Sequence, residues 1–145
     1  MSQYILDTDH LRFLQRNHPL VVQRVATINP RDIAVTIVTV EEQCRGRLDS
    51  IRQASTNGSQ ADRLVLAYTR LGETLDDFKS INILKFDEEA YIRYADLRSQ
   101  RIRIGTQDLK IAAIALSKNS ILVTRNQRDF AQVPDLIFED WTILP

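Results

Sequence analysis

A helix-forming run and a strand-forming run follow one another in the sequence Leu109-Lys110-Ile111-Ala112-Ala113-Ile114-Ala115-Leu116 and Ile121-Leu122-Val123-Thr124. The first run is apolar nearly all round a helix and carries small residues that allow close packing on a sheet. The second has the β-branched and apolar composition of a buried strand. Similar strands and helices alternate along the whole chain. This pattern predicts an α/β fold with a central, mainly parallel sheet of about four to five strands, flanked by helices on both faces.

The remaining elements follow from apolar spacing and from turn residues. Thr8 or Asp9 is the expected cap of the first helix, and Asn57-Gly58-Ser59 is expected to break the helix that starts near residues 37–39. The expected strands cover residues 3–7, 33–36, 81–84, 121–124 and 136–138. The other expected helices cover residues 8–17, 19–28, 60–78, 88–101, 106–118 and 127–131.

Length and composition set broad limits on the class of protein. The chain has 145 residues with 43% hydrophobic content, which predicts one domain over residues 1–145 with a single core. No apolar run approaches the ~20 residues needed to span a membrane, and the N-terminus lacks the basic and apolar regions of a secretory signal. Cys44 is the only cysteine, so a disulfide or a cysteine-rich zinc site within the chain is excluded. We expect a cytoplasmic protein.

The charged residues balance, with 19 basic and 19 acidic side chains. This balance argues against a protein that coats nucleic acid by charge alone. Fifteen of the basic residues are arginine, whose guanidinium suits bidentate contact with phosphate. Several arginines lie close in sequence to the acids Glu42, Asp108 and Asp129; the ordinary alternative for each arginine is a solvated helix face. They are Arg45, Arg47, Arg98, Arg101, Arg103, Arg125 and Arg128.

Four acids stand at the boundaries of expected elements: Asp7, Glu42, Asp108 and Asp129. In open parallel sheets, ligands bind beyond the carboxyl ends of the strands, so these side chains can meet there. A pair of like charges ~4 Å apart costs on the order of 4 kcal/mol in a partly desolvated site. Each acid alone has an ordinary explanation as a cap, turn or surface residue, but together they predict a divalent metal site.

Other candidate chemistry is weaker. His10 follows Asp7 by three residues and is a possible helical neighbour, which we expect to be structural rather than a ligand or base. Cys44 has no second thiol nearby and is expected to be a small buried residue. The chain has only four glycines and lacks a phosphate-cradling glycine loop. Trp141 is expected to pack the C-terminus against the body.

Four motifs resemble the PIN-domain ribonucleases, and most closely the VapC toxins of toxin–antitoxin pairs, over nearly the whole chain. In the second motif the family has a glycine four residues after its acid. Gly46 follows Glu42 by four residues, so Glu42 rather than Glu41 corresponds to the family acid. Asp9 and Glu41 are departures from the family pattern, as is Gln43, and either acid could join the metal shell. The motifs are Tyr4-Ile5-Leu6-Asp7-Thr8-Asp9, Thr39-Val40-Glu41-Glu42-Gln43-Cys44-Arg45-Gly46, Ile104-Gly105-Thr106-Gln107-Asp108-Leu109-Lys110-Ile111-Ala112-Ala113 and Leu122-Val123-Thr124-Arg125-Asn126-Gln127-Arg128-Asp129-Phe130.

The resemblance implies a Mg²⁺- or Mn²⁺-dependent endoribonuclease that inhibits translation, often by cutting transfer RNA. Asp7, Glu42, Asp108 and Asp129 would hold one or two ions, because hard oxygen ligands suit these metals. Thr124 and Asn126 would orient the acids. The resemblance also implies a small VapB-like antitoxin that blocks the groove, and a homodimer that we expect to form through the helices between residues 37 and 78.

Two other classes of protein remain as alternatives. One is a PIN-like module that binds but does not cleave. The other is a phosphatase of the haloacid-dehalogenase type, whose Asp-x-Asp start is matched superficially by Asp7 and Asp9. That class expects Thr or Val at the position of Leu11 and a catalytic lysine, a part that Lys110 or Lys118 would have to play.

Overall fold

A five-stranded sheet forms the centre of the computed structural model, which describes residues 2–56 and 60–145. The strand order is β3-β2-β1-β4-β5, and all four pairings are parallel. This arrangement confirms the predicted α/β class and parallel sheet. The strands are β1 (Tyr4–Leu6), β2 (Ile33–Thr36), β3 (Asn82–Leu84), β4 (Ile121–Val123) and β5 (Phe138–Glu139).

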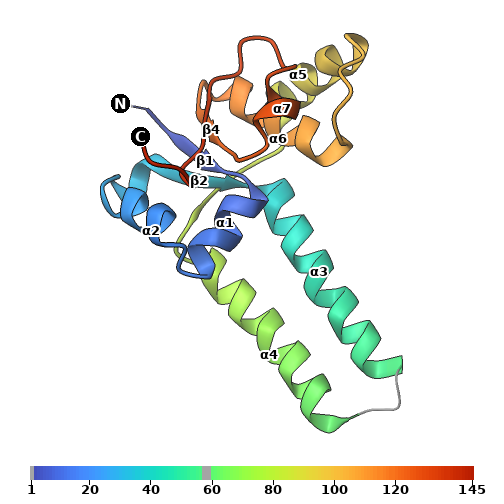
Figure 1. Cartoon of the computed structure of the whole chain (residues 1–145). Coiled ribbons are helices and arrows are strands. Elements are labelled where there is room, and N and C mark those ends of the chain that lie inside the picture. The colour runs from blue at the N-terminus through green and yellow to red at the C-terminus, as the bar shows by residue number, and fades with distance from the viewer. Residues whose placement is uncertain (1, 57–59) are drawn as a thin grey trace.

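The helices divide into a body and a long hairpin (Figure 1). In the hairpin, α3 and α4 pack along one another and run away from the sheet. The break that we predicted at Asn57-Gly58-Ser59 lies outside the described residues. The helices are α1 (Thr8–Gln15), α2 (Pro19–Ala26), α3 (Ile37–Thr56), α4 (Ala61–Phe78), α5 (Glu88–Ser99), α6 (Thr106–Ser117) and α7 (Gln127–Phe130), with a 3₁₀ turn η1 (Pro30–Asp32).

Both faces of the sheet are covered, because successive strand side chains point to opposite faces. Ile5 and Leu122 pack on one side with the core residues of α5 and α6. Leu6 and Val123, their neighbours in sequence, pack on the other side with Leu11, Val21 and Trp141. Burial of both faces is why the central strands β1 and β4 are continuously apolar instead of alternating with polar residues.

The first strand ends one residue earlier than predicted because Asp7 leaves the sheet to cap α1. Its Oδ1 accepts a hydrogen bond from the backbone N–H of His10 at 2.8 Å. The prediction of Thr8 or Asp9 as the cap was therefore wrong. The Asp7 N–H still donates to the carbonyl of Val123 at 3.0 Å, so the cap remains attached to the end of β4.

The last strand was also placed too early, at residues 136–138. Asp135 adopts a positive φ of 67°, and Leu136 turns into the core. The hydrogen bonds to β4 are accepted by the carbonyls of Ile137 and Glu139, which sets the register at Phe138 and Glu139. Trp141 is 3% exposed, as expected for a residue that packs the C-terminus down.

No helix within residues 2–56 and 60–145 has both the length and the apolar character needed to cross a membrane.

Candidate metal centre

The topology brings the four acids to the carboxyl edge of the sheet. Asp7 follows β1 directly, and Asp129 lies on α7, just after the neighbouring strand β4. Glu42 lies on the second turn of α3, which follows β2 on the other side of β1. Asp108 lies in the first turn of α6. This edge is where parallel sheets bind ligands.

Asp108 lies at the electrostatic centre of this group. Burial, together with the charges of Glu42, Asp7 and Asp129 and a smaller effect from Asp9, raises the pKa of its carboxyl group to about 6. The N-terminus of α6 favours an anion, but burial and the surrounding like charges outweigh that effect. A bound cation would reduce the electrostatic repulsion on a carboxylate in this position.

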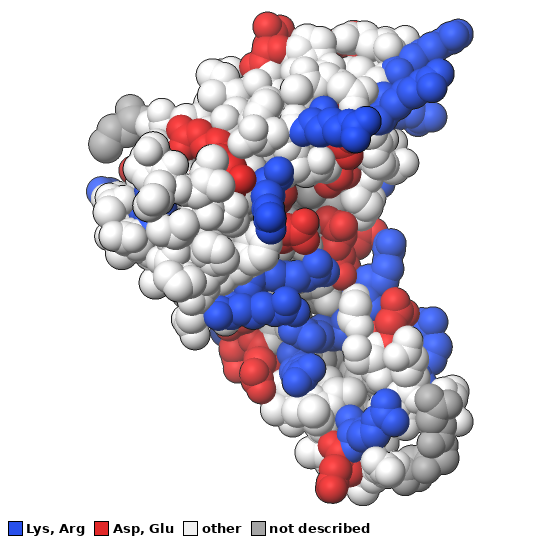
Figure 2. Space-filling model, in the orientation of Figure 1, with Lys and Arg blue, Asp and Glu red and all other residues white. Residues whose placement is uncertain are grey.

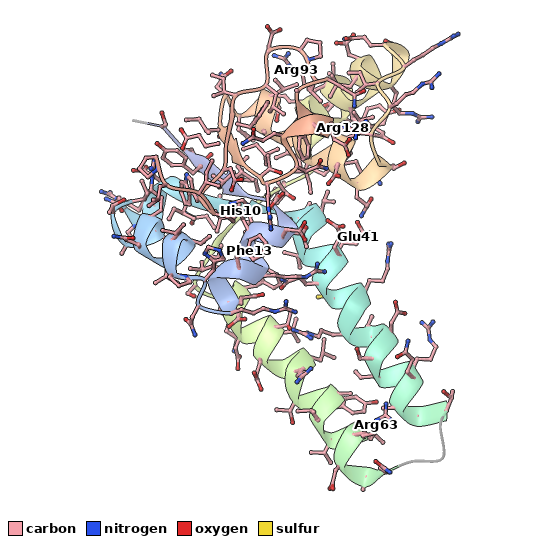
Figure 3. All side chains as sticks on the ribbon, viewed as in Figure 1. His10, Phe13, Glu41, Arg63, Arg93 and Arg128 are labelled. Carbon is pink, nitrogen blue, oxygen red and sulfur yellow. The ribbon has the colours of Figure 1, made fainter. Side chains whose placement is uncertain are left out.

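Asp7 is fixed by its own helix and by His10. The Asp7 side chain is 9% exposed, and that of His10 is fully buried. Asp7 Oδ1 faces His10 Nδ1 at 3.3 Å, and His10 Nε2 accepts a hydrogen bond from the backbone N–H of Trp141 at 3.1 Å. Figure 3 shows His10 where α1 leaves the sheet. As expected, His10 is a packed residue, and it connects Asp7 to the C-terminal segment.

Glu42 and Glu41 occupy different surroundings. Glu42 Oε1 accepts a 2.7 Å hydrogen bond from the hydroxyl of Thr8, the residue after Asp7. Glu41 instead pairs with Arg45 at 2.7 Å and accepts from Gln107 at 2.8 Å, beside the first turns of α3 (Figure 3). The geometry favours Glu42 over Glu41 as the member of the acidic group. Asp9 is exposed and pairs with Arg12 at 3.3 Å.

Asp129 is oriented by the loop that follows β4. The amide of Asn126 donates to Asp129 Oδ2 at 2.9 Å. The buried hydroxyl of Thr124 accepts from the backbone N–H of Asn126 at 3.0 Å. Asn126 therefore contacts an acid directly, whereas Thr124 acts one step further away by holding Asn126.

The donor set is suited to a hard divalent cation, since it consists of carboxylate oxygens. Within the described ranges, however, no three His, Cys, Asp or Glu side chains already form a closed ligand set. The charges are close enough to shift the pKa of Asp108 without being at ligand distance. Like-charged carboxylates repel one another, so a bound cation would favour a closer arrangement of these acids.

A cleft of about 640 Å³ lies between α1, α3 and α4, and its lining includes Gln43, the residue after Glu42. We name it the arginine cleft after Arg12, Arg16, Arg47 and Arg70, which line it together with Glu73 and Asp77. Figure 2 shows basic side chains gathered next to an acidic group in this region. Our reading of the sequence included Arg47 but missed the other three arginines. For two of them the available signal was in the sequence, because Arg12 and Arg16 stand four residues apart at the first expected helix.

The lysines required by the phosphatase alternative are engaged elsewhere. Lys118 Nζ pairs with Asp87 at 3.2 Å, and Lys110 Nζ donates to Gln107 at 3.4 Å. Leu11 is fully buried in the core. Cys44, expected to be buried, is only half-buried.

Comparison with known proteins agrees with this topology. The PIN domain family matches residues 4–136. Ribonuclease VapC1 of Haemophilus influenzae strain R2866 is 30% identical, over 96% of this chain and 98% of its own length. The tRNA(fMet)-specific endonuclease VapC of Salmonella typhimurium strain LT2 is 27% identical, over 97% and 99%. The solved structure of VapBC-1 from nontypeable Haemophilus influenzae matches with a TM-score of 0.75 at 29% identity, over 97% and 98%. The chain belongs to the PIN-domain family and, within it, to the VapC ribonucleases.

Proposed function

We propose that this VapC-type ribonuclease is an endoribonuclease that depends on Mg²⁺ or Mn²⁺. The observation that carries the proposal is the half-buried carboxyl of Asp108, surrounded by the charges of Glu42, Asp7 and Asp129. Structural acids are normally neutralised by a nearby cationic side chain, whereas burial and then like charge raise the pKa of this group. Perturbed titratable groups of this kind mark functional sites.

The chain's own residues would hold and orient the ion. Asp7, Glu42, Asp108 and Asp129 would bind it through carboxylate oxygens. Thr8 would direct Glu42, and Asn126 would direct Asp129, through the hydrogen bonds described above. When bound, the ion supplies a Lewis acid for the phosphodiester and a more acidic water for in-line attack. Arginines near the acids would position the RNA backbone.

The substrate that we propose is RNA, with transfer RNA as the first candidate, because one relative is a tRNA(fMet)-specific endonuclease. Cleavage would inhibit translation in the cytoplasm. A VapB-like antitoxin would bind the chain and block the acidic edge; the VapBC-1 structure supports a partner of this kind. We also propose a homodimer through residues 37–78, where Leu48, Val65 and Leu66 expose apolar side chains.

RNA cleavage with and without Mg²⁺ or Mn²⁺ tests the proposed activity. Asp129→Asn should abolish cleavage, because it removes one charged ligand at unchanged size. Asp135→Asn is the matched control. Asp135 is exposed, follows α7 and has a positive φ, a conformation that Asn also tolerates. Cleavage by Asp129→Asn at the wild-type rate would contradict the proposal.

Thermal unfolding separates metal binding from catalysis. A ligand that binds only the folded state stabilises it by about 2.7 kcal/mol at a hundred times its dissociation constant. The wild-type melting temperature should rise with Mn²⁺, and that of Asp7→Asn should not. A wild type that binds Mn²⁺ and RNA but leaves transfer RNA uncut would favour the non-cleaving PIN-like module instead.

A further inference from the structure

We propose that the arginine cleft binds the phosphodiester backbone of the RNA and leads it to the acidic edge. This inference rests on the proposed function, since it adds a binding site beside the proposed centre. A carboxylate cluster repels phosphate, so RNA that reaches Asp108 requires cationic contacts nearby. The cleft supplies four arginines against two carboxylates.

The guanidinium groups of the cleft are largely unneutralised. Of its arginines, only Arg12 forms an ion pair in the described part of the chain. Arg47 is oriented by a 2.9 Å hydrogen bond from its Nε to the hydroxyl of Thr74, which is 2% exposed. Its terminal nitrogens remain for a bidentate phosphate contact. An arginine that is fixed by a neutral partner loses little freedom when an anion binds.

The cleft reaches the turn of α3 that carries Glu42. Its lining includes Gln43, the residue after Glu42, which pairs with Gln15 through two amide hydrogen bonds of 3.0 and 3.2 Å. Along α3, the rise from Glu42 to Arg47 is roughly 7.5 Å at 1.5 Å per residue. Arg12 and Arg16 extend the same cleft along α1. An extended chain of phosphates suits this path better than a single compact anion.

Gly46 leaves the wall of the cleft open. It lies in the middle of α3 and lines the cleft, and a Cβ atom at this position would meet nothing within 4 Å. Packing within the chain therefore does not require glycine there, although glycine weakens a helix interior. A ligand that approaches the backbone closely is a physical reason for its presence.

Binding of a fluorescent oligouridylate in EDTA tests the cleft without requiring catalysis. The Arg16→Gln/Arg70→Gln variant should bind about tenfold more weakly at low salt, with a salt slope reduced by about 1.4, since each single-strand phosphate contact contributes about 0.7. Arg31→Gln/Arg93→Gln is the matched control with the same charge change. Arg31 precedes β2 at the opposite edge of the sheet, and Arg93 lies on α5, away from the cleft (Figure 3).

The glycine provides a second, independent test. Gly46→Glu places a carboxylate in the cleft and should weaken binding about tenfold or more. Gly72→Glu adds the same charge at an exposed glycine of α4 that does not line the cleft, and should retain wild-type affinity. Unchanged RNA affinity in both cleft variants would overturn the proposal, even if antitoxin binding fell. Loss of RNA cleavage in Asp129→Asn would stand independently of this result.

As a second inference, the structure assigns His10 the role of a positioning residue for Asp7. The backbone N–H of Trp141 donates to Nε2, which also lies 3.5 Å from Asp140 Oδ1. An Nε2 that accepts this bond carries no hydrogen, so we place the ring hydrogen on Nδ1, facing Asp7 Oδ1. Oδ1 also accepts the His10 N–H. Both bonds fix one carboxylate oxygen and leave Oδ2 for the proposed ion. The C-terminal segment thereby determines the orientation of an acid that is 134 residues earlier in the sequence.

Nitrogen NMR of the unaltered protein tests this hydrogen-bond chain directly, because a protonated ring nitrogen is distinguished from an unprotonated one. The hydrogen of His10 should be on Nδ1; a hydrogen on Nε2 would overturn the assignment. In Mn²⁺ titrations, His10→Leu should weaken binding about tenfold, within the range for groups that orient metal ligands. His10→Asn retains a donor near the position of Nδ1 and should restore part of the affinity. Full Mn²⁺ affinity in folded His10→Leu would also refute the role.

Discussion

The candidate metal centre and the arginine cleft are adjacent but assembled differently. The acids come from the starts of α1, α3, α6 and α7, where these helices leave the carboxyl edge of the sheet. The arginines come from the sides of α1, α3 and α4, along the length of those helices. The first site is fixed by the ends of elements, and the second by how three helices pack.

The two sites also differ in how their charge is balanced. Burial raises the pKa of Asp108, and the charges of Glu42, Asp7 and Asp129 add to that effect. The cleft carries unpaired guanidinium groups. A substrate that bridges the two sites would neutralise the cleft through its phosphates, whereas a metal ion would neutralise the acids. This contrast separates residues needed for chemistry from residues needed for affinity.

The largest expected effect follows from Glu42→Gln. Removing one of the proposed ligand charges should lower RNA cleavage by about a thousandfold, or about 4 kcal/mol of transition-state stabilisation. Glu41→Gln is the control. It makes the same substitution one residue earlier. Because Glu41 pairs with Arg45 and Gln107, the cleavage rate should change little. Equal losses in both variants, measured in the same cleavage assay, would show that the two acids are not distinguished as the geometry indicates.

A smaller effect is expected when the support of Asp129 is removed. Thr124→Val keeps the side-chain shape but leaves the Asn126 N–H without its acceptor. The free energy of unfolding should fall by about 2 kcal/mol, and Mn²⁺ affinity should fall because Asn126 shifts against Asp129. Thr124→Ser retains the hydroxyl and should stay close to wild type in both measurements. If Thr124→Val retains full Mn²⁺ affinity, Thr124 contributes to stability but not to metal binding.

The acidic edge was predictable because topology does most of the placement. Once strands are recognised and taken as parallel, residues that follow them must meet at one edge. The proximity of Asp7 and Asp129 follows from the pairing of β1 with β4 alone. The register of Gly46 favoured Glu42, and the hydrogen bond from Thr8 agrees.

The cleft and the role of His10 depend on contacts that sequence spacing does not encode. Arg70 joins the cleft because α4 returns along α3, and Asp77 contacts Gln15 at 3.2 Å across 62 residues. His10 receives its second partner from Trp141, 131 residues away. The late start of β5 has a local cause, the left-handed conformation of Asp135, which a non-glycine residue rarely adopts. Long-range packing and single unusual dihedral angles thus limit the prediction.

The pH dependence of stability tests the acidic edge alone. Asp108 has an ordinary pKa of 3.8 and a folded pKa of about 6. The folded state therefore binds the proton more tightly than the unfolded state does. In EDTA, the stability associated with protonated Asp108 is fully present below pH 3.8 and is lost as the pH rises through about 6. Asp108→Asn should remove this loss and stabilise the metal-free protein at neutral pH by about 1–2 kcal/mol, after allowance for solvent screening.

Chemical denaturation across this pH range, in EDTA, measures the difference. Asp62→Asn is the matched control, because Asp62 is also a first-turn helix acid but is exposed. Its stability should not increase at neutral pH. If Asp108→Asn brings no gain at neutral pH, the acids do not repel one another in the metal-free protein, and the charge contrast with the cleft is lost.

The smallest effect, from the glycines, separates folding from binding most cleanly. Gly46→Ala and Gly72→Ala should each raise the free energy of unfolding by up to about 1 kcal/mol, because neither new Cβ meets an atom within 4 Å. Denaturant titrations should therefore give the two variants similar gains. Only Gly46 lines the cleft, so only Gly46→Ala should weaken RNA binding. If RNA affinity instead falls equally in both, the effect arises from the stiffness of the hairpin, and the role of Gly46 in the cleft wall is refuted.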